Sequence, residues 1–257
     1  MRFEPLNVKY NDSWQDVNPH WIFSIRVLFD EAVGHNAIKW RSRVEQQTAP
    51  YPLLKCITDK VVALVVLSIA LPILILIILV MTLSMLLRPA DRGGLFYLEP
   101  RISRGRVFNL VKFRVLRQNV IARMPPDDKH ARIYEADSSN LTWAGRYLLK
   151  RWYFDELPQL FNILNGDMTL VGPRPWPLPL VKNQLESGII YRNLIHAGWT
   201  GPSQLQKGNP TPENTEKLDL EYLNRCFTWS NWRLWRYDCN ILFQTIKVIV
   251  RGEGLAY

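Results

Sequence analysis

The segment Val61–Leu87 runs for 27 residues without a charged side chain. A helix needs about 20 apolar residues to cross the hydrocarbon of a bilayer, and core helices of soluble proteins rarely stay uncharged for so long. The segment starts too far into the chain for a secretory signal peptide. It therefore predicts a helix inserted in a membrane. Pro72, near its middle, lacks a backbone N–H and predicts a kink there.

Two geometries fit this helix: a tilted span and a re-entrant helix that returns to the side from which it came. Lys55 and Lys60 precede the apolar run, and Arg88 and Arg92 follow it. Positive charge at both ends gives no asymmetry from which to orient a span. On these residues alone, an ordinary kinked span and a re-entrant helix with both ends in the cytoplasm both remain open.

The whole chain of 257 residues carries a formal net charge of +9. Such an excess favours an acidic partner, and anionic lipid, nucleotide phosphate and nucleic acid all qualify. The three cysteines and four histidines are scattered, without the spacing of a zinc site or of a disulfide framework. A reducing cytoplasm is the simplest setting for such a chain.

Besides the membrane segment, the chain is long enough to bury one substantial core. We predict three parts: an N-terminal extension of unknown role over residues 1–54, the membrane helix over 55–90 and one compact soluble domain over 91–257. The predicted class is α+β and mostly helical. The expected elements are an amphipathic helix near Trp21–Val33, a strand over Phe108–Arg114, a loop over Gln118–Asn140 and an apolar helix over Tyr237–Val250.

Asp155 and Glu156 lie just ahead of a predicted short helix. Pro158 suits a first helical turn and Asn165-Gly166 is a typical stop, which gives a helix over about Pro158–Leu164. The free N–H groups at its start attract phosphate and favour ionised carboxylates. An ionised aspartate can attack phosphorus while a neighbouring glutamate holds Mg²⁺. On their own, however, acidic residues before a helix are ordinary caps.

Cations that phosphoryl transfer needs occur around this acidic pair. Gly172-Pro173-Arg174-Pro175 fixes Arg174 in a rigid turn, where its forked guanidinium suits a phosphate. Lys150 comes shortly before the pair, and Lys112 and Arg114 share one face of the predicted strand. Phosphoryl transfer depends on positioning and on neutralising charge at phosphorus. The set of carboxylates and cations therefore indicates phosphate chemistry at a membrane surface.

A longer ordered series of residues surrounds these motifs and covers about 200 residues. The series comprises Lys55, Asp59, Lys112-Phe113-Arg114, Thr142, Gly145-Arg146, Asp155-Glu156-Leu157-Pro158-Gln159-Leu160, Asn162, Gly166-Asp167-Met168, Val171-Gly172-Pro173-Arg174-Pro175, Arg192, Gly198, Thr200-Gly201 and Gln204. It resembles the bacterial sugar transferase family, the monotopic polyprenyl-phosphate phosphoglycosyl transferases. Such a series is far more specific than any single motif.

The resemblance implies a monotopic protein of the bacterial inner membrane, with a re-entrant helix kinked at Pro72 and its catalytic domain on the cytoplasmic face. It implies that Asp155 attacks the sugar-bearing phosphate of a UDP-sugar and releases UMP. A polyprenyl phosphate, typically undecaprenyl phosphate, then accepts the sugar phosphate as the first membrane step of glycan assembly. Glu156 is implied to bind Mg²⁺. The implied substrate-binding residues are Lys112, Arg114, Lys150, Pro173, Arg174 and Arg192.

Two positions depart from the family pattern at places that matter. Leu71 stands where a serine usually precedes the kink proline, so the hydroxyl that would satisfy a freed carbonyl is missing. Lys150 stands where arginine is common, which keeps the charge but loses the bidentate geometry.

A second hypothesis comes from another class of protein: a non-catalytic, membrane-anchored binder of anionic lipid or nucleic acid. No helix-turn-helix, zinc-finger or RNP-like pattern supports nucleic acid as a partner, and a simple binder has no need of Asp155 beside Glu156. Membrane lipid is an expected partner under either hypothesis. Homo-oligomer formation stays open.

Overall fold

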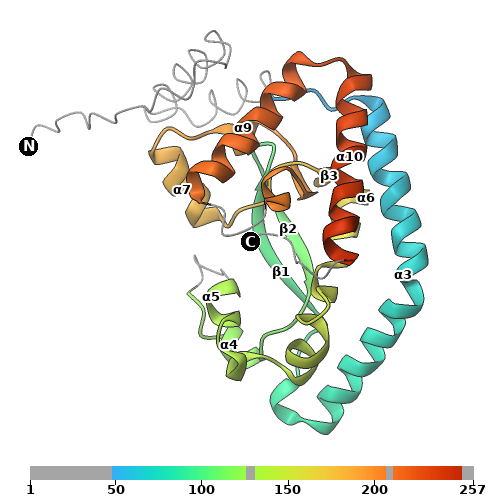
Figure 1. Ribbon diagram of the computed structural model, residues 1–257. Helices are drawn as coiled ribbons and strands as arrows, with labels where there is room; N and C mark the ends of the chain where they lie inside the picture. Colours follow the sequence, from blue (N-terminus) through green and yellow to red (C-terminus); the bar gives the residue numbers. More distant parts are fainter. Residues whose placement is uncertain (1–47, 126–130, 207–210, 251–257) are drawn as a thin grey trace, which may run out of the picture.

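The computed structural model describes residues 48–125, 131–206 and 211–250. The amphipathic helix predicted near Trp21–Val33 lies outside these residues. Within them the protein is mostly helical, with two small two-stranded sheets, which confirms the predicted α+β class. Figure 1 shows the long helix α3 (Leu53–Leu87) running along one side of the folded domain.

Helix α3 spans 35 residues and is therefore roughly 50 Å long. It is the one candidate membrane span among the described residues. Buried positions recur every three or four residues, as expected for one face of a helix. The other faces expose leucine, isoleucine and valine, a surface that suits lipid. The buried stripe consists of Lys55, Asp59, Ala63, Leu67, Ala70, Leu74, Ile77, Met81 and Ser84.

Pro72 lies inside α3 without ending it. Proline cannot donate the hydrogen bond that the Ser68 carbonyl would otherwise accept, and this loss favours bending. Figure 1 shows that α3 curves along its length while remaining one helix. A helix long and apolar enough to cross a membrane is thus present where the composition predicts one, and its re-entrant geometry stays a prediction.

Strands β1 (Phe96–Ser103) and β2 (Arg106–Phe113) form an antiparallel hairpin. Its two loop residues, Arg104 and Gly105, have positive φ angles of 49° and 71°, as tight hairpin turns of the primed types require. The strand predicted from the alternating pattern is therefore confirmed. It begins two residues earlier than predicted and ends at Phe113.

A second, parallel pair of strands lies at the centre of the domain, between the acidic pair and the C-terminal helices in sequence. The second strand of the pair approaches the main chain that follows the first so closely that only glycine fits at position 198, because a Cβ there would collide with the backbone of Gly172. The elements of this region are α6 (Gln159–Asn165), β3 (Met168–Val171), α7 (Leu178–Glu186), α8 (Tyr191–Leu194) and β4 (Ala197–Thr200).

The segment predicted as a loop over residues 118–140 contains three short helical elements in its described part, so that prediction is wrong there. Buried apolar side chains at Val120, Met124 and Ala131 anchor these turns in the core, and the charged residues around them concealed that pattern. The elements are α4 (Gln118–Ile121), α5 (Ala131–Glu135) and the turn η3 (Ser138–Asn140).

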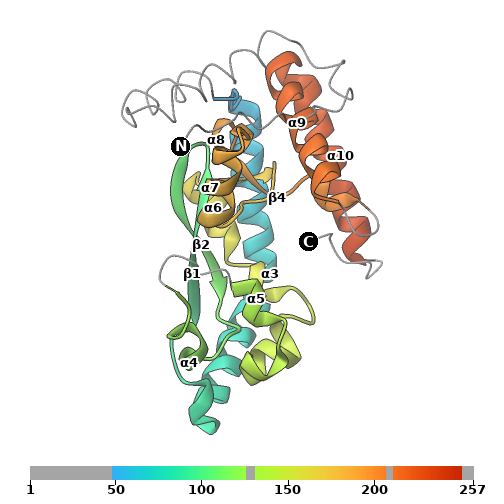
Figure 2. The same ribbon diagram turned by 90° about the vertical axis from the view of Figure 1, so that its left-hand side faces the viewer.

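Two long helices, α9 (Pro212–Thr228) and α10 (Asn231–Val250), complete the described chain. The apolar helix predicted from Tyr237 onward is confirmed, but α10 begins earlier, at Asn231. Figure 2 shows the β1–β2 hairpin on one side of α3 and the α9–α10 pair on the other. Helix α10 contacts both α3 and β3, which links the membrane helix to the centre of the domain.

Both ends of α3 are attached to this one domain. Near its start, Lys55 Nζ donates a hydrogen bond to the Asp238 carboxylate of α10 at 2.6 Å. Near its end, the Ser84 hydroxyl donates to the Asp91 carboxylate at 2.7 Å, and the same carboxylate accepts the Trp143 N–H at 2.9 Å. A single folded unit therefore holds two ends of a helix that is long enough to cross a bilayer.

Candidate active site

Asp155 and Glu156 lie in one 3-10 turn, η5 (Phe154–Glu156), directly ahead of α6. The short helix predicted after them is confirmed with a shift of one residue, and it ends at Gly166 with a φ of 85°. Just before the pair, Tyr153 adopts a left-handed φ of 57°, which costs a non-glycine residue roughly 1 kcal/mol. Backbone strain beside two acidic side chains is typical of a functional site.

The Asp155 side chain is almost completely buried, with 3% of its surface exposed. One oxygen, Oδ2, accepts a hydrogen bond from Lys150 Nζ at 3.1 Å. The other, Oδ1, has no hydrogen-bond partner among the described residues. Burial raises the pKa of Asp155 to about 6, although the Lys150 charge acts in the opposite direction. The helix start is expected to favour ionisation, but burial outweighs it at this carboxyl.

Lys150 follows η4 (Gly145–Leu149), a π-helical turn of a kind that is frequent at functional sites. Its Nζ lies 2.6 Å from Glu135 Oε2 and 3.1 Å from Asp155 Oδ2. Burial alone would lower the pKa of Lys150, but the two carboxylates outweigh it and raise the pKa. Glu135 was missed by the sequence reasoning because it lies in the segment predicted as a loop.

Glu156 pairs with Arg174, whose Nη2 lies 3.0 Å from Glu156 Oε1. Burial alone would raise the pKa of Glu156, but the charges of Arg174, Lys112 and Lys150 outweigh burial and lower it. The environment thus shifts the pKa values of the two adjacent acids in opposite directions, a pattern that divides roles between paired carboxyls. Pro173, buried in the same turn as Arg174, contributes the rigid main chain that the sequence predicts.

Lys112 reaches the site from β2. Its charge helps to lower the pKa of Glu156 and opposes the rise that burial causes in the pKa of Asp155. Its Nζ also lies 3.1 Å from Glu99 Oε2, and the other oxygen of Glu99 lies 2.5 Å from Arg101 Nη2. Glu99 and Arg101 share one face of β1 by strand alternation. Sequence reasoning missed both residues, although a period-two reading of β1 would have placed them beside Lys112.

The structure does not bring Arg114 to the acidic pair, contrary to the prediction. Its guanidinium is buried and donates to the carbonyl oxygens of Gly94 at 2.6 Å, Leu116 at 2.7 Å and Asp91 at 2.6 Å. The Arg114 N–H still pairs with the Leu95 carbonyl at 2.8 Å, as it would in a continued strand, but the side chain is engaged by these three carbonyl oxygens. Arg114 therefore supports the main chain near the end of the membrane helix and lies outside the predicted anion pocket.

Arg192 contacts the main chain of the Arg174 turn and does not contact the acidic pair. Its Nη1 donates to the Arg174 carbonyl at 2.6 Å, and its Nη2 pairs with Asp219 at 3.0 Å. Its guanidinium also lies 4.0 Å from the centre of the Trp176 ring. The side chain is buried, with 4% of its surface exposed, so its charge is already neutralised inside the protein.

A cofactor metal is the remaining element of the predicted site. No cluster of three or more His, Cys, Asp or Glu side chains arranged for a metal occurs in residues 48–125, 131–206 and 211–250. Mg²⁺ in phosphate-transfer sites needs fewer protein ligands, because one or two carboxylates and substrate oxygens suffice. The unpartnered Oδ1 of Asp155 and the adjacent Glu156 carboxylate fit that simpler donor set.

Comparison with known proteins identifies relatives of this chain. The sequence profile of the bacterial sugar transferase family matches residues 50–252. The undecaprenyl-phosphate galactose phosphotransferase of Salmonella typhimurium is 34% identical over 218 residues, which are 78% of this chain and 41% of that protein. The UDP-galactose-lipid carrier transferase of Erwinia amylovora is 32% identical over 254 residues, which are 91% of this chain and 46% of that protein.

The UDP-N-acetylgalactosamine-undecaprenyl-phosphate N-acetylgalactosaminephosphotransferase of Aeromonas hydrophila is 30% identical over 176 residues, 66% of this chain and 39% of that protein. The chain thus spans less than half the length of these three curated relatives. The matched profile nevertheless includes the membrane helix, the acidic pair and the Arg174 turn. This protein belongs to the bacterial sugar transferase family.

Proposed function

We propose that this protein transfers a sugar phosphate from a UDP-sugar to undecaprenyl phosphate and releases UMP. Family membership and the activities named for the relatives support the reaction class. The single observation that carries the proposal is the buried carboxylate of Asp155, which has one oxygen held by Lys150 and the other unpartnered within the described chain. An oriented, desolvated carboxylate is suited to attack phosphorus.

The proposed chemistry consists of two displacements at the same phosphorus atom. A carboxylate oxygen of Asp155 bonds to the sugar-bearing phosphorus of the donor, and the P–O bond to UMP breaks. A phosphate oxygen of the lipid acceptor then attacks that phosphorus, and the aspartyl ester bond breaks. Asp155 returns to its ionised state without net gain or loss of protons on the enzyme. The bond between the sugar carbon and its oxygen stays intact, so the anomeric configuration is retained.

The charges around Asp155 suit this sequence of steps. With a pKa near 6, the carboxylate is mostly ionised at neutral pH and more basic than an exposed aspartate, which favours nucleophilic attack. Lys150, held between Asp155 and Glu135, orients the attacking carboxylate. Arg174 and Lys112 supply positive charge where the donor's phosphates would lie.

Magnesium is the proposed cofactor. Glu156 would hold the ion, with the free oxygen of Asp155 close by. When bound there, the ion would neutralise charge on the donor's pyrophosphate oxygens. The Arg174 guanidinium forms an ion pair with the Glu156 carboxylate at 3.0 Å. We therefore expect the guanidinium to shift toward the donor phosphates as the ion binds to Glu156.

We further propose that α3 is re-entrant and that the domain lies on the cytoplasmic face of the bacterial inner membrane. The support is the attachment of both ends of α3 to one folded domain, through Lys55 near the start and Ser84 near the end. A folded domain cannot lie on both sides of a bilayer, because its polar backbone and charged groups would have to cross hydrocarbon. The donor would then approach from the cytosol while the acceptor phosphate lies at head-group depth.

The proposal is tested by measuring UMP release from a panel of UDP-sugars. The full chain in lipid nanodiscs is incubated with undecaprenyl phosphate and Mg²⁺, and Asp155→Asn serves as the matched inactive variant. We expect release with at least one donor, none from the variant and none after chelation of the metal. Turnover by Asp155→Asn would refute the nucleophile. Membrane binding without release from any donor would favour the non-catalytic binder.

A further inference from the structure

The turn that carries Arg174 is held at both ends through its main chain. The carbonyl oxygen of Val171, just before the turn, accepts hydrogen bonds from Lys55 Nζ at 3.1 Å and from the Tyr222 hydroxyl at 3.0 Å. The carbonyl oxygen of Arg174 itself accepts one from Arg192 Nη1 at 2.6 Å. Side chains from α3, α9 and α8 therefore converge on a segment of four residues.

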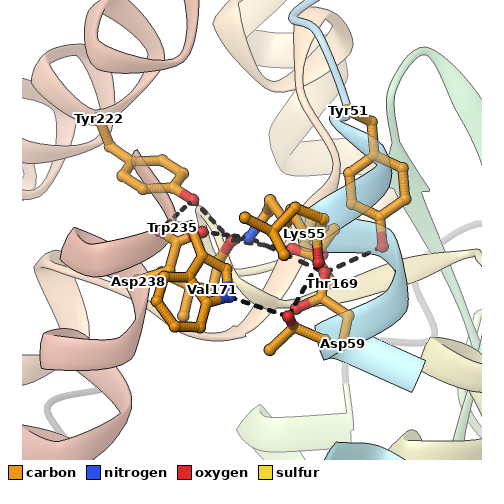
Figure 3. Close-up of polar contacts among 11 residues, drawn as sticks. Tyr51, Lys55, Asp59, Thr169, Val171, Tyr222, Trp235 and Asp238 are labelled. Atoms are coloured by element: carbon orange, nitrogen blue, oxygen red, sulfur yellow. Dashed lines mark hydrogen bonds and ion pairs between the residues drawn. The ribbon is translucent and has the colours of Figure 1, made fainter. Parts of the chain in front are cut away.

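The first group of contacts, the Lys55 cluster, consists of Lys55, Tyr222 and Asp238. Lys55 Nζ lies 2.6 Å from Asp238 Oδ2, and these side chains are only 8% and 7% exposed. The Tyr222 hydroxyl lies 2.9 Å from Asp238 Oδ1 as well as near Val171, and its single proton can serve one of these acceptors at a time. Figure 3 shows the cluster where the membrane helix and α10 meet the end of β3.

The second group, the Arg192 cluster, consists of Arg192, Asp219, Tyr191 and Ser203. The Asp219 carboxylate accepts hydrogen bonds from Arg192 Nη2 at 3.0 Å, from the Tyr191 hydroxyl at 3.0 Å and from the Ser203 hydroxyl at 2.9 Å. Three donors on one buried carboxylate fix its orientation. The guanidinium that bonds to this carboxylate is therefore aimed at the Arg174 carbonyl with little freedom to move.

Stability alone is a poor explanation for two such groups. Buried ion pairs add little to stability, since apolar replacements of similar volume are often neutral or stabilising. Their hydrogen bonds, however, fix the direction of whatever they contact. Here the cation of each pair also donates to a carbonyl oxygen of the Arg174 turn, Lys55 to that of Val171 and Arg192 to that of Arg174. The residues between are held too, because the Gly172 N–H donates to the Thr200 carbonyl at 2.9 Å.

We propose that Lys55 and Arg192 are positioning residues that hold the main chain of the Arg174 turn and so direct the Arg174 side chain toward the acidic pair and the donor phosphates. The first turn of α3 is then part of the active-site framework. This inference rests on the proposed function. It gives Arg192 the role of holding the Arg174 carbonyl, in place of the substrate-binding role that the family resemblance implies. Lys55 likewise acts through the Val171 carbonyl and does not touch the substrate.

The test uses the full chain in nanodiscs, with UMP release at varied donor concentration. Lys55→Met combined with Asp238→Leu removes the closest ion pair of the Lys55 cluster. Asp59, whose carboxylate lies 3.8 Å from Lys55 Nζ, keeps the hydrogen bond from the Tyr51 hydroxyl at 2.9 Å. Arg192→Lys keeps the charge of its cluster but loses the fork that reaches Asp219 and Arg174 together. We expect each change to lower kcat/KM for the donor roughly tenfold to a hundredfold, the usual loss for a group displaced by about 1 Å.

Matched controls come from exposed cations on the same elements. Lys60→Met changes a cation that is exposed about one turn further along α3 than Lys55. Arg236→Lys changes one that is exposed on α10, two residues before Asp238. Each is expected to change kcat/KM by less than about twofold. A loss at these exposed positions equal to that of the cluster variants would contradict the assignment.

The decisive comparison repeats the changes in an Arg174→Lys background, with UMP release followed long enough to quantify slow turnover. If the clusters act through Arg174, their additional loss should shrink below about twofold there. The same factor in both backgrounds would mean a merely structural role and would overturn the proposal. Should the double variant fail to fold, Tyr222→Phe, which deletes only one hydroxyl, replaces it with the same two expected outcomes.

The outcomes also separate this inference from the proposed function. Absence of UMP release by the unchanged protein with every donor would refute the function itself. Normal release by the unchanged protein, together with full activity of Arg192→Lys and of the Lys55 cluster variants, would refute only the positioning role.

Discussion

Lys150 Nζ lies 3.1 Å from the buried Asp155 carboxylate and 2.6 Å from that of the partly buried Glu135, so one cation is shared by two acids. Because burial raises the pKa of Asp155 to about 6, we expect kcat to fall as the pH drops through that value. Lys150→Gln removes the main opposing charge, so the midpoint of this fall should move upward by about one unit or more.

The measurement for this prediction is the pH dependence of UMP release under donor saturation. Arg151→Gln is the matched control, because Arg151 is the adjacent cation and is exposed. Its profile should follow that of the unchanged protein. An unmoved midpoint in Lys150→Gln would mean that the ammonium does not act on the nucleophile.

Asp155→Asn should abolish activity without weakening the fold. In the folded protein this carboxyl holds its proton more tightly than in the unfolded chain, where its pKa is near 3.8. Folding is thus most favoured where the proton is bound, and stability is lost as the pH rises through about 6. A neutral Asn removes this penalty, so at about pH 8 the free energy of unfolding should rise by up to roughly 3 kcal/mol.

Thermal unfolding of Asp155→Asn and of the unchanged protein, at about pH 8 and about pH 5, checks this expectation. The difference in Tm should be larger at the higher pH, with the variant equally or more stable. A variant clearly less stable at the higher pH would show that the ionised carboxylate stabilises the fold, against the burial argument.

Gly198→Ala should disrupt the fold around the Arg174 turn. An added Cβ would meet the main chain of Gly172, which cannot move aside like a flexible side chain. We expect a loss of about 3 kcal/mol or more in the free energy of unfolding. Gly94→Ala is the control, since its Cβ would find its nearest atom, the Phe96 carbonyl oxygen, at an ordinary 3.6 Å. Equal melting temperatures for both variants would contradict the tight contact.

A re-entrant α3 predicts that both of its flanks face the cytoplasm. Pro50→Cys and Arg92→Cys lie at exposed positions on either side of the helix. In a background with the three native cysteines replaced, a membrane-impermeant thiol reagent should label both from the cytoplasmic side only. Labelling of the two positions from opposite sides would make α3 a true span.

Much of the architecture could be predicted from local patterns. The uncharged run predicted the long apolar helix α3, and Pro158 with the Asn165-Gly166 stop located α6 to within one residue. The meeting of Asp155, Glu156, Lys150 and Arg174 was anticipated mainly through the family resemblance, because spacing along the chain does not specify which loops approach in space.

Two residues that the family resemblance implies for substrate binding do not contact the acidic pair. The Arg114 guanidinium donates instead to three main-chain carbonyl oxygens, those of Gly94, Leu116 and Asp91. Arg192 was likewise implied by the resemblance, and its guanidinium pairs with Asp219, 27 residues away in sequence. The contact of Lys55 with Asp238 joins residues 183 positions apart, and no local pattern reports a pairing of that range.

The most direct test of the account is the intact mass of the protein after incubation with its UDP-sugar donor and Mg²⁺, with the lipid acceptor withheld. We predict a mass increase equal to one sugar phosphate, located on the peptide that contains Asp155 and absent from Asp155→Asn. Addition of undecaprenyl phosphate should then remove it. Steady UMP release by a protein that never carries this adduct would contradict the covalent mechanism.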